Sequence, residues 1–170
     1  MSASETSRHR HLTAPYCTGN GVDIGSGGDP VVPHAIQVEL VSPYGCVFGD
    51  LAGVEWRGDA LDLPFKDGTL AFVYSSHLLE DYADWNPPLR EWTRVLKPGG
   101  HLVILLPDRE RWHAALMRGQ PPNLAHQHEG SPGELSTYCD ALGLEPVIDG
   151  LIHPDDPNEY SIMFVGRKRG

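Results

Sequence analysis

Two acidic residues flank a glycine-rich segment near the start of the chain. Residues 22–30 read VDIGSGGDP and residues 36–39 read IQVE, so Asp23 and Glu39 each lie in or after a short apolar stretch. Glycines allow the backbone to approach a ligand closely, and a carboxylate at the end of the second stretch can accept both hydroxyls of a ribose. The pattern predicts a nucleotide-type cofactor site at the carboxyl ends of two parallel strands.

This segment differs from the dinucleotide-binding fingerprint in two ways. The turn GSGGDP lacks the third glycine of the fingerprint G-x-G-x-x-G. Glu39 also follows Gly25 too closely, since the dinucleotide pattern places its acid roughly twenty residues after the glycines. The sequence therefore disfavours an NAD-dependent oxidoreductase.

Three further segments follow the glycine-rich turn in a fixed order. They read GDALDLPF at 58–65, YSSHLLED at 74–81 and LKPGGHLVILLP at 96–107. With residues 22–30, they resemble the class I S-adenosylmethionine (SAM)-dependent methyltransferases, and most of all the small domains with the signature DIG-G, GDA-DLPF, SSH-LEH and RVLKPGG. The resemblance covers residues 20–110 well and the rest more loosely. It implies a Rossmann-like class I methyltransferase fold, SAM as cofactor and S-adenosylhomocysteine as product.

The resemblance also implies which residues bind the cofactor. The acid in the first strand organises the pocket near the amino-acid end of SAM, the acid after the second strand binds the ribose, and the acid of GDA accepts from the adenine amino group. Two serines lie at the carboxyl end of the fourth strand, where open sheets bind ligands. The full expected set is Asp23, Gly25, Ser26, Gly27, Glu39, Asp59, Ala60, Leu61, Ser75 and Ser76.

Each acid in this set also has a structural interpretation. Asp23 can fix the glycine turn by accepting backbone N–H bonds, as Asp often does in turns, and both roles are compatible. Glu39 can be a solvated strand end, and Asp59 can cap the short turn at 62–65. We favour the ribose role for Glu39 and the adenine role for Asp59.

Four residues are candidates for catalysis or acceptor binding. They are His77, Asp108, His126 and His128. An imidazole titrates near neutral pH, so His77 can take a proton from an acceptor. The competing interpretation, which we favour for His77, is that its side chain hydrogen-bonds the backbone at the start of a helical turn.

The stretch NLAHQHEGSPGEL, residues 123–135, contains His126 and His128. It resembles the histidine-lysine-histidine loop of the family before a Thr/Ser-Pro-Glu helix start, with glutamine in place of lysine. Three interpretations compete: a lid with an acceptor-binding histidine, a structural loop that bonds the helix start, and a metal-binding histidine pair. Two histidines without a clear third ligand are weak support for a metal, so none is expected.

Strands and helices alternate along the chain. Short apolar stretches predict strands at 22–24, 35–39, 54–57, 70–74, 101–106, 144–149 and 160–166. Asn86 and Pro87 open one predicted helix, which Pro98 ends. A capping box from Ser131 to Glu134 opens another. The pattern predicts a mostly parallel seven-stranded sheet with an antiparallel last strand, because the loop 153–159 is too short for a crossover helix.

The segment between Gly28 and Ala35 is too short for the helix that usually follows the glycine turn in this family. Residues 40–53 also show little helical pattern. One face of the sheet is therefore thinly covered, which is costly at roughly 25 cal/mol per Å² of exposed apolar surface. The N-terminal arm, the proline-rich loops or a second subunit in a homodimer must cover it.

Composition bounds the remaining possibilities. The 170 residues predict a polar, loose N-terminal arm at 1–20 and a single domain at 21–170. The net charge of -10 argues against a broad grip on nucleic acid. No signal peptide or apolar run long enough to span a bilayer is visible. The three cysteines lack any paired spacing, which favours a reducing, cytoplasmic location.

The sequence thus predicts transfer of a methyl group from SAM to a small-molecule acceptor. The acceptor atom is an oxygen or a nitrogen, and a sugar or a secondary metabolite fits the compact, acidic chain. The alternative is a catalytically degenerate methyltransferase-fold protein that acts as a binding or scaffold partner. The missing helix supports that alternative, whereas the retention of Asp23, Glu39 and Asp59 opposes it.

Overall fold

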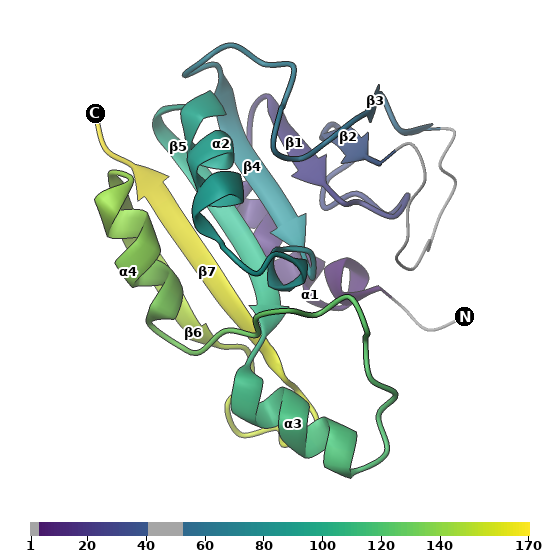
Figure 1. The fold of residues 1–170 in the computed structure, drawn as a ribbon. Helices are drawn as coiled ribbons and strands as arrows, with labels where there is room; N and C mark the ends of the chain where they lie inside the picture. The colour runs from purple at the N-terminus through teal and green to yellow at the C-terminus, as the bar shows by residue number, and fades with distance from the viewer. Residues whose placement is uncertain (1–3, 41–52) are drawn as a thin grey trace.

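A twisted seven-stranded sheet forms the centre of the computed structural model, which describes residues 4–40 and 53–170. The strand order across the sheet is β3-β2-β1-β4-β5-β7-β6 (Figure 1). The strands are β1 (Gly21–Ile24), β2 (Ile36–Glu39), β3 (Trp56–Arg57), β4 (Leu70–Ser76), β5 (Leu96–Pro107), β6 (Leu144–Leu151) and β7 (Ser161–Lys168).

All strands except β7 run in the same direction. β7 pairs antiparallel with β5 on one side and with β6 on the other. The Ile152 N–H donates to the Ser161 carbonyl (2.9 Å) where the β6–β7 connection closes. The predicted mixed sheet with an antiparallel last strand is confirmed, and the connection contains no helix that could carry the chain across the sheet.

Helices lie on both faces of the sheet. α2 (Asn86–Val95) and α4 (Glu134–Ala141) lie in front of it in Figure 1, and α1 (Glu5–Thr13) lies behind it. α3 (Arg109–Met117) lies beyond the carboxyl end of β5. The helices therefore leave the carboxyl edge of β1 and β2 to loops.

Alternating side chains of the central strands fill two apolar layers. In β5, Leu102, Ile104 and Leu106 belong to the layer that contains Leu89 and Trp92 of α2. Val103 and Leu105 belong to the opposite layer, together with Cys17 and Val31, and Leu12 of α1 packs against it. Both faces of this strand are therefore buried, as its continuous apolar run predicts.

The expectation of a loose arm before residue 21 is wrong. Residues 5–13 form α1, which begins after Ser4, whose side chain accepts from the Ser7 N–H (2.9 Å). The side chains that α1 buries are polar, namely Thr6, His9 and Thr13. Because apolar periodicity is the main sequence signal for a surface helix, such a helix escapes prediction.

The region after the glycine turn agrees with prediction. Residues 28–35, all described by the structure, contain turns and bends but no helix. Val31 and Val32 of this segment are buried in the same apolar layer that Leu12 of α1 covers. The N-terminal segment and the proline-containing turn therefore cover the face that lacks the usual helix. Most of 40–53, the other region expected to lack a helix, lies outside the described residues.

The start of α4 differs from prediction. Ser131 does not cap it, because the helix begins at Glu134, after Gly133 in a left-handed conformation (φ 86°). The cap comes instead from Asp149 in β6, whose carboxylate accepts from the Gly133 N–H (3.0 Å) and the Ser136 N–H (3.1 Å). A cap supplied from a distant strand has no signature within the helix sequence itself.

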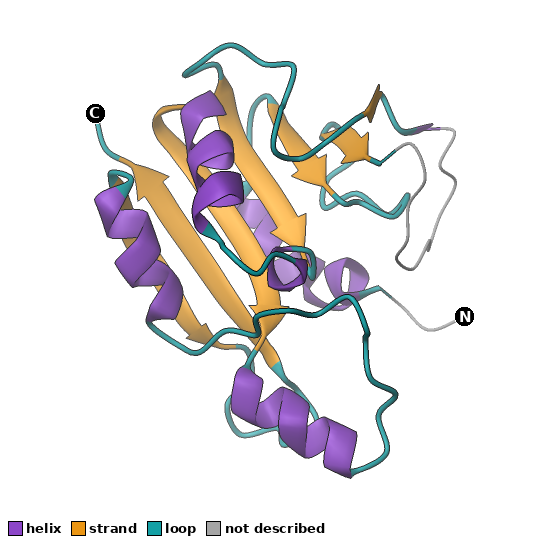
Figure 2. Cartoon of the chain, viewed as in Figure 1, coloured by secondary structure: helices purple, strands orange, loops and turns teal. Residues whose placement is uncertain are grey.

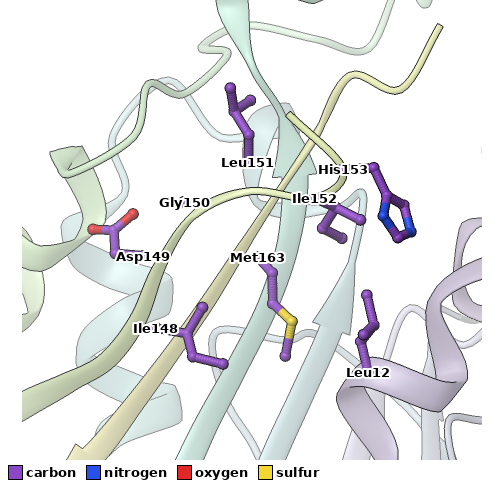
Figure 3. A pocket seen from close by; sticks show the side chains of 8 residues that line it. All are labelled: Leu12, Ile148, Asp149, Gly150, Leu151, Ile152, His153 and Met163. Carbon is purple, nitrogen blue, oxygen red and sulfur yellow. The ribbon is translucent and has the colours of Figure 1, made fainter. Parts of the chain in front are cut away.

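The cavity in Figure 3 lies at the β6 edge of the sheet, next to α1, and has a volume of about 290 Å³. Its lining residues are Leu12, Ile148, Asp149, Gly150, Leu151, Ile152, His153 and Met163. None of these residues belongs to the expected cofactor site, which lies across the sheet at β1 and β2.

None of the helices in the described ranges is long and apolar enough to cross a membrane.

Candidate cofactor and acceptor site

The expected site residues gather at one edge of the sheet. Ile24 of β1 pairs with Val38 of β2 on one side and with Ser75 of β4 on the other. The residues that follow these positions therefore leave the sheet at the same edge. They include the glycine turn after β1, Glu39 at the end of β2 and Ser76 at the end of β4.

The glycine turn requires backbone conformations that other residues rarely adopt. Gly25, Gly27 and Gly28 have φ values of 73°, 56° and 80°, in the left-handed region that glycine adopts at no steric cost. The Gly25 N–H donates to the Val38 carbonyl (2.9 Å), and the Ser26 hydroxyl donates to the Gln37 side chain (3.0 Å). The turn is thus tied to β2.

Glu39 contacts the turn directly. The Gly27 N–H donates to its Oε2 atom (3.1 Å), and the Leu40 N–H donates to its Oε1 atom (3.0 Å). A carboxylate has about four acceptor positions, so these two bonds leave about two for further donors. The half-buried Glu39 can therefore accept two ribose hydroxyls without giving up its bonds to the turn.

Asp23 fixes the end of the same turn. Its side chain is 1% exposed, and its Oδ2 atom accepts from the Val31 N–H (2.6 Å). Burial raises the pKa of this carboxyl to about 8. The structural role considered for Asp23 is thus present.

Helix α1 holds the far end of the glycine turn through Asp29. The hydroxyls of Ser4 and Ser7 both donate to Oδ2 of Asp29, the latter at 2.6 Å, and Arg10 donates to Oδ1. Arg10 also donates to the Pro30 carbonyl (3.2 Å). Partial burial opposes ionisation of Asp29, but these bonds outweigh it and lower its pKa. α1 therefore positions the turn in place of a following helix.

We expect Asp29→Ala to destabilise the protein by about 1–2 kcal/mol, since it removes charge-assisted bonds at a partly exposed site. The melting temperature should fall by about 2–8 °C in calorimetry. The affinity for S-adenosylhomocysteine should fall as well, because the turn loses its anchor to α1. Asp155→Ala, at an exposed loop position, is the matched control. Wild-type melting and affinity in Asp29→Ala would contradict this role of α1.

The segment Asp59–Leu61 is held by the core beneath it. The Asp59 Oδ1 atom accepts from the Leu61 N–H (2.9 Å), so its side chain bonds the backbone just before the turn at 62–65 that it was expected to cap. The Ala60 carbonyl accepts from the indole N–H of buried Trp92 (3.0 Å). Asp59 itself is exposed, so its carboxylate is open to a further donor such as an adenine amino group.

The two serines at the end of β4 differ in their surroundings. Ser75 is fully buried, and its hydroxyl donates to the Ile24 carbonyl (3.2 Å). Ser76 is half-buried at the last position of the strand. Of the two, Ser76 is therefore the better placed to contact a ligand.

His77 is held in a left-handed backbone conformation, with φ at 52°. Its Nδ1 atom lies 3.2 Å from Oε1 of Glu80, and its Nε2 atom lies 3.3 Å from the Ser161 hydroxyl. Burial opposes the charge on His77, but the Glu80 carboxylate outweighs it and raises the pKa of the imidazole. The side chain thus bonds to other side chains rather than to the local backbone.

Glu80 is a functional candidate that the sequence reasoning missed. It lies in the 3₁₀ helix η3 (Leu79–Asp81), and its side chain is fully buried. Its Oε1 atom also lies 3.5 Å from Nε2 of His126. Among the described residues neither Glu80 oxygen has a well-aligned hydrogen bond, although nitrogens of His77 and His126 lie 3.2 and 3.5 Å from Oε1. The sequence signal that could have identified Glu80 is its position three residues after His77.

The loop 118–133, which connects α3 and α4 (Figure 2), is anchored to η3. The N–H groups of Gln127 and His128 donate to the Glu80 carbonyl (2.8 and 3.0 Å). The His128 ring stacks on Trp85 with a centroid distance of 4.1 Å, and its Nε2 atom lies 3.0 Å from Oε1 of Glu134. These contacts favour the structural interpretation for His128. His126 instead lies beside Glu80, together with His77.

We expect His128→Ala to lower stability by about 1–2 kcal/mol, because it removes an aromatic stack and a bond to a carboxylate. The melting temperature should fall, while the affinity for S-adenosylhomocysteine should change little. His113→Ala, at an exposed position on α3, provides the control. Unchanged stability with reduced turnover in His128→Ala would instead favour the acceptor-binding interpretation.

Asp108 is the N-cap residue of α3, a helix that the sequence analysis did not predict. The Asp108 carboxylate accepts from the Arg111 N–H (2.9 Å) at the helix N-terminus, and the side chain is buried. Only Trp112 and Ala115 of α3 are buried, so the helix has little apolar periodicity. N-capping therefore accounts for the position of Asp108 at the end of β5.

Comparisons with known proteins agree with this geometry. A family model described as a methyltransferase domain matches residues 22–104. The chain is 30% identical over 119 residues to the uncharacterized protein YafE of Escherichia coli K12, covering 66% of this chain and 55% of YafE. It is 44% identical over 49 residues to the demethylmenaquinone methyltransferase of Bacillus pumilus, covering 29% of this chain and 21% of that enzyme.

The fold matches that of solved methyltransferases. The Burkholderia thailandensis 1,6-didemethyltoxoflavin-N1-methyltransferase, solved with 1,6-didemethyltoxoflavin and S-adenosylhomocysteine, aligns with a TM-score of 0.70 at 14% identity. The alignment covers 97% of this chain and 78% of that one. At this identity the likeness shows the fold alone.

The sheet order, the glycine turn and the matched family model define the class of this protein. Residues 22–104 match the methyltransferase-domain family, and the fold is that of solved methyltransferases. It spans about half the length of YafE and about a fifth of the demethylmenaquinone methyltransferase.

Proposed function

We propose that the protein transfers the methyl group of SAM to an oxygen or nitrogen atom of a small-molecule acceptor and releases S-adenosylhomocysteine. The observation that carries the proposal is Glu39, a half-buried carboxylate beside a left-handed glycine turn, with acceptor positions left for a ribose. The family match supports SAM as the cofactor. The net charge of -10 supports a small acceptor, such as a sugar or a secondary metabolite, over a nucleic acid.

The cofactor roles follow the carboxyl edge of the sheet. Glu39 would bind the ribose, the segment Asp59–Leu61 the adenine, and Ser76 the methionine portion. The turn of Gly25, Ser26 and Gly27 would let the backbone approach the ligand, with Asp23 fixing its conformation. When bound, SAM supplies a strongly electrophilic methyl group on its sulfonium.

Proton removal from the acceptor is assigned to His77. The imidazole lies at the carboxyl end of β4, next to the proposed position of the methionine portion. The Glu80 carboxylate at Nδ1 stabilises the imidazolium that forms when His77 takes a proton. An amine acceptor that is already neutral needs this assistance less than a hydroxyl does.

The competing function is a binding or scaffold role for a catalytically degenerate domain. The observation that favours it is the absence of a helix in the described segment 28–35. The bonds from α1 to Asp29 weaken this argument, because they position the glycine turn by other means.

A turnover assay tests the proposal. The protein is incubated with methyl-labelled SAM and a panel of hydroxyl- and amine-bearing metabolites, and S-adenosylhomocysteine and labelled product are measured by mass spectrometry. We expect both to form with at least one acceptor class and to fall sharply in Glu39→Ala. Tight S-adenosylhomocysteine binding without turnover across the panel would favour the degenerate domain.

A further inference from the structure

Three side chains that the proposed function does not use converge in the interior. Nε2 of His9 lies 3.3 Å from Oε2 of Glu5 and 3.1 Å from Oε2 of Glu159. One ligand atom from each residue lies within 4.8 Å of the others. Glu5 and His9 lie one turn apart on α1, and Glu159 lies just before β7.

The cluster is buried, and its imidazole lacks ordinary hydrogen bonds. The side chains of His9 and Glu159 are 3% and 2% exposed. Within the part of the chain that the structure describes, neither ring nitrogen of His9 makes a well-aligned hydrogen bond, despite the two nearby carboxylates. Nε2 of His9 thus faces two carboxylate oxygens without a well-aligned hydrogen bond to either, an arrangement that an ion held between the three side chains would explain.

The spacing of these atoms suits a metal ion. Zinc binds imidazole nitrogen and carboxylate oxygen at about 2.0–2.2 Å with tetrahedral geometry, which separates neighbouring ligand atoms by roughly 3.3–3.5 Å. The two separations at Nε2 of His9, 3.3 and 3.1 Å, lie close to this range. We propose that Glu5, His9 and Glu159 bind a divalent transition-metal ion, with Zn²⁺ the best match, and leave a fourth position for an exogenous oxygen ligand.

The second oxygen of each carboxylate is bound by a neighbouring group. Oε1 of Glu5 accepts from Arg8 (2.7 Å), and Oε1 of Glu159 accepts from the Ser161 N–H (2.8 Å). Such outer bonds orient metal ligands and are a regular feature of metal sites. They point the Oε2 atoms of Glu5 and Glu159 toward His9.

A proton competes with the metal for this site. The carboxylates of Glu159 and Glu5 outweigh burial and raise the pKa of His9 to about 9. Arg8 also lies 2.9 Å from Oε2 of Glu159. Without metal, protonated His9 and Arg8 therefore balance the two carboxylates.

Groups from other elements also face the cluster and affect the protonation of its side chains. His77 interacts with Glu5, Tyr160 interacts with Arg8, and the His153 ring lies 6.4 Å from that of His9.

The site adjoins the proposed acceptor site through one hydroxyl. The Ser161 Oγ atom lies 3.4 Å from Oε2 of Glu5 and 3.3 Å from Nε2 of His77. The metal inference does not rest on methyl transfer, because its test measures bound metal rather than turnover.

Metal content and melting temperature test the proposal. The full chain is equilibrated with Zn²⁺ at pH 8, dialysed against buffer and analysed by elemental mass spectrometry, with Zn²⁺ affinity measured by competition with a chromogenic chelator. We expect one tight equivalent in the wild type and a melting temperature raised by Zn²⁺. His9→Gln and Glu159→Gln should each bind that equivalent at least tenfold more weakly. His11→Gln, at an exposed position on the same helix, should bind it as the wild type does.

Two outcomes would overturn the proposal. One is a wild type that retains no Zn²⁺ at pH 8. This result would show that Glu5, His9 and Glu159 hold no Zn²⁺ and share a proton instead. The other is equal retention in the wild type, His9→Gln and Glu159→Gln, which would place the metal elsewhere. Circular dichroism confirms that each variant is folded, and Glu5→Gln, at a more exposed ligand, replaces a variant that does not fold.

Discussion

His77→Asn is expected to lower turnover with a hydroxyl acceptor by about 10²–10⁴-fold, the usual contribution of a general base. Asparagine tolerates the left-handed backbone that His77 adopts at a φ of 52°. The substitution therefore removes the titrating group with little backbone strain. S-adenosylhomocysteine affinity should stay within about twofold of the wild type, since the expected adenosine contacts lie on β2 and on the segment 59–61.

The pH profile separates a base from a structural residue. Turnover of the wild type should depend on the ionisation of His77, whose pKa is raised by Glu80. In His77→Asn this ionisation should be absent from the pH profile of turnover. His113→Asn, at an exposed position on α3, should leave both the rate and the profile unchanged. A fall in melting temperature and in S-adenosylhomocysteine affinity together would show that His77 acts through the fold instead.

Glu39→Ala is expected to weaken SAM binding by about 1.5–3 kcal/mol, the range for hydrogen bonds to a charged group. This loss corresponds to a rise in Kd of about 10–150-fold. The physical reason is that the carboxylate has acceptor positions left after its bonds to the N–H groups of Gly27 and Leu40. Isothermal titration calorimetry with SAM measures the effect.

The matched control for this prediction is Glu55→Ala. Glu55 is exposed, directly precedes β3 and accepts from the Gln37 N–H of β2 (2.8 Å), whereas the bond to the glycine turn comes from Glu39. Its replacement should leave SAM affinity unchanged. If Glu39→Ala bound SAM as the wild type does, the ribose would have to be placed elsewhere.

The sheet and the glycine turn could be predicted because their signals are local. The central strands contain apolar runs, at 70–74 in β4 and at 102–106 in β5, and both runs are buried. Gly25 and Gly27 form a turn that other residues would strain. Their order along the chain, together with a connection too short for a helix before β7, was enough to set the topology.

The helices α1 and α3 could not be predicted because neither combines its local N-cap with an apolar periodicity. α1 buries Thr6, His9 and Thr13, and the partners of His9 include Glu159 at the other end of the chain. α4 is capped by Asp149 from a distant strand. A periodicity analysis registers apolar side chains and nearby caps, so it misses helices held by distant polar contacts.

In the candidate acceptor site, too, the residue types could be predicted from the sequence but their contacts could not. His77 and His126 stand out as histidines near strand ends, but the sequence does not show that the buried carboxylate of Glu80 lies between them. The bond from Ser161 to His77 arises from the antiparallel placement of β7 beside β5. The residue types were therefore visible, whereas their pairing depended on the fold.

Binding of S-adenosylhomocysteine to the wild-type protein tests the central claim most directly. We expect saturable binding of one ligand per chain in isothermal titration calorimetry, with a melting temperature raised by mass action on the native state. NAD should produce neither effect. The absence of any S-adenosylhomocysteine or SAM binding at millimolar ligand, or a raised melting temperature with NAD instead, would contradict a SAM site at this edge of the sheet.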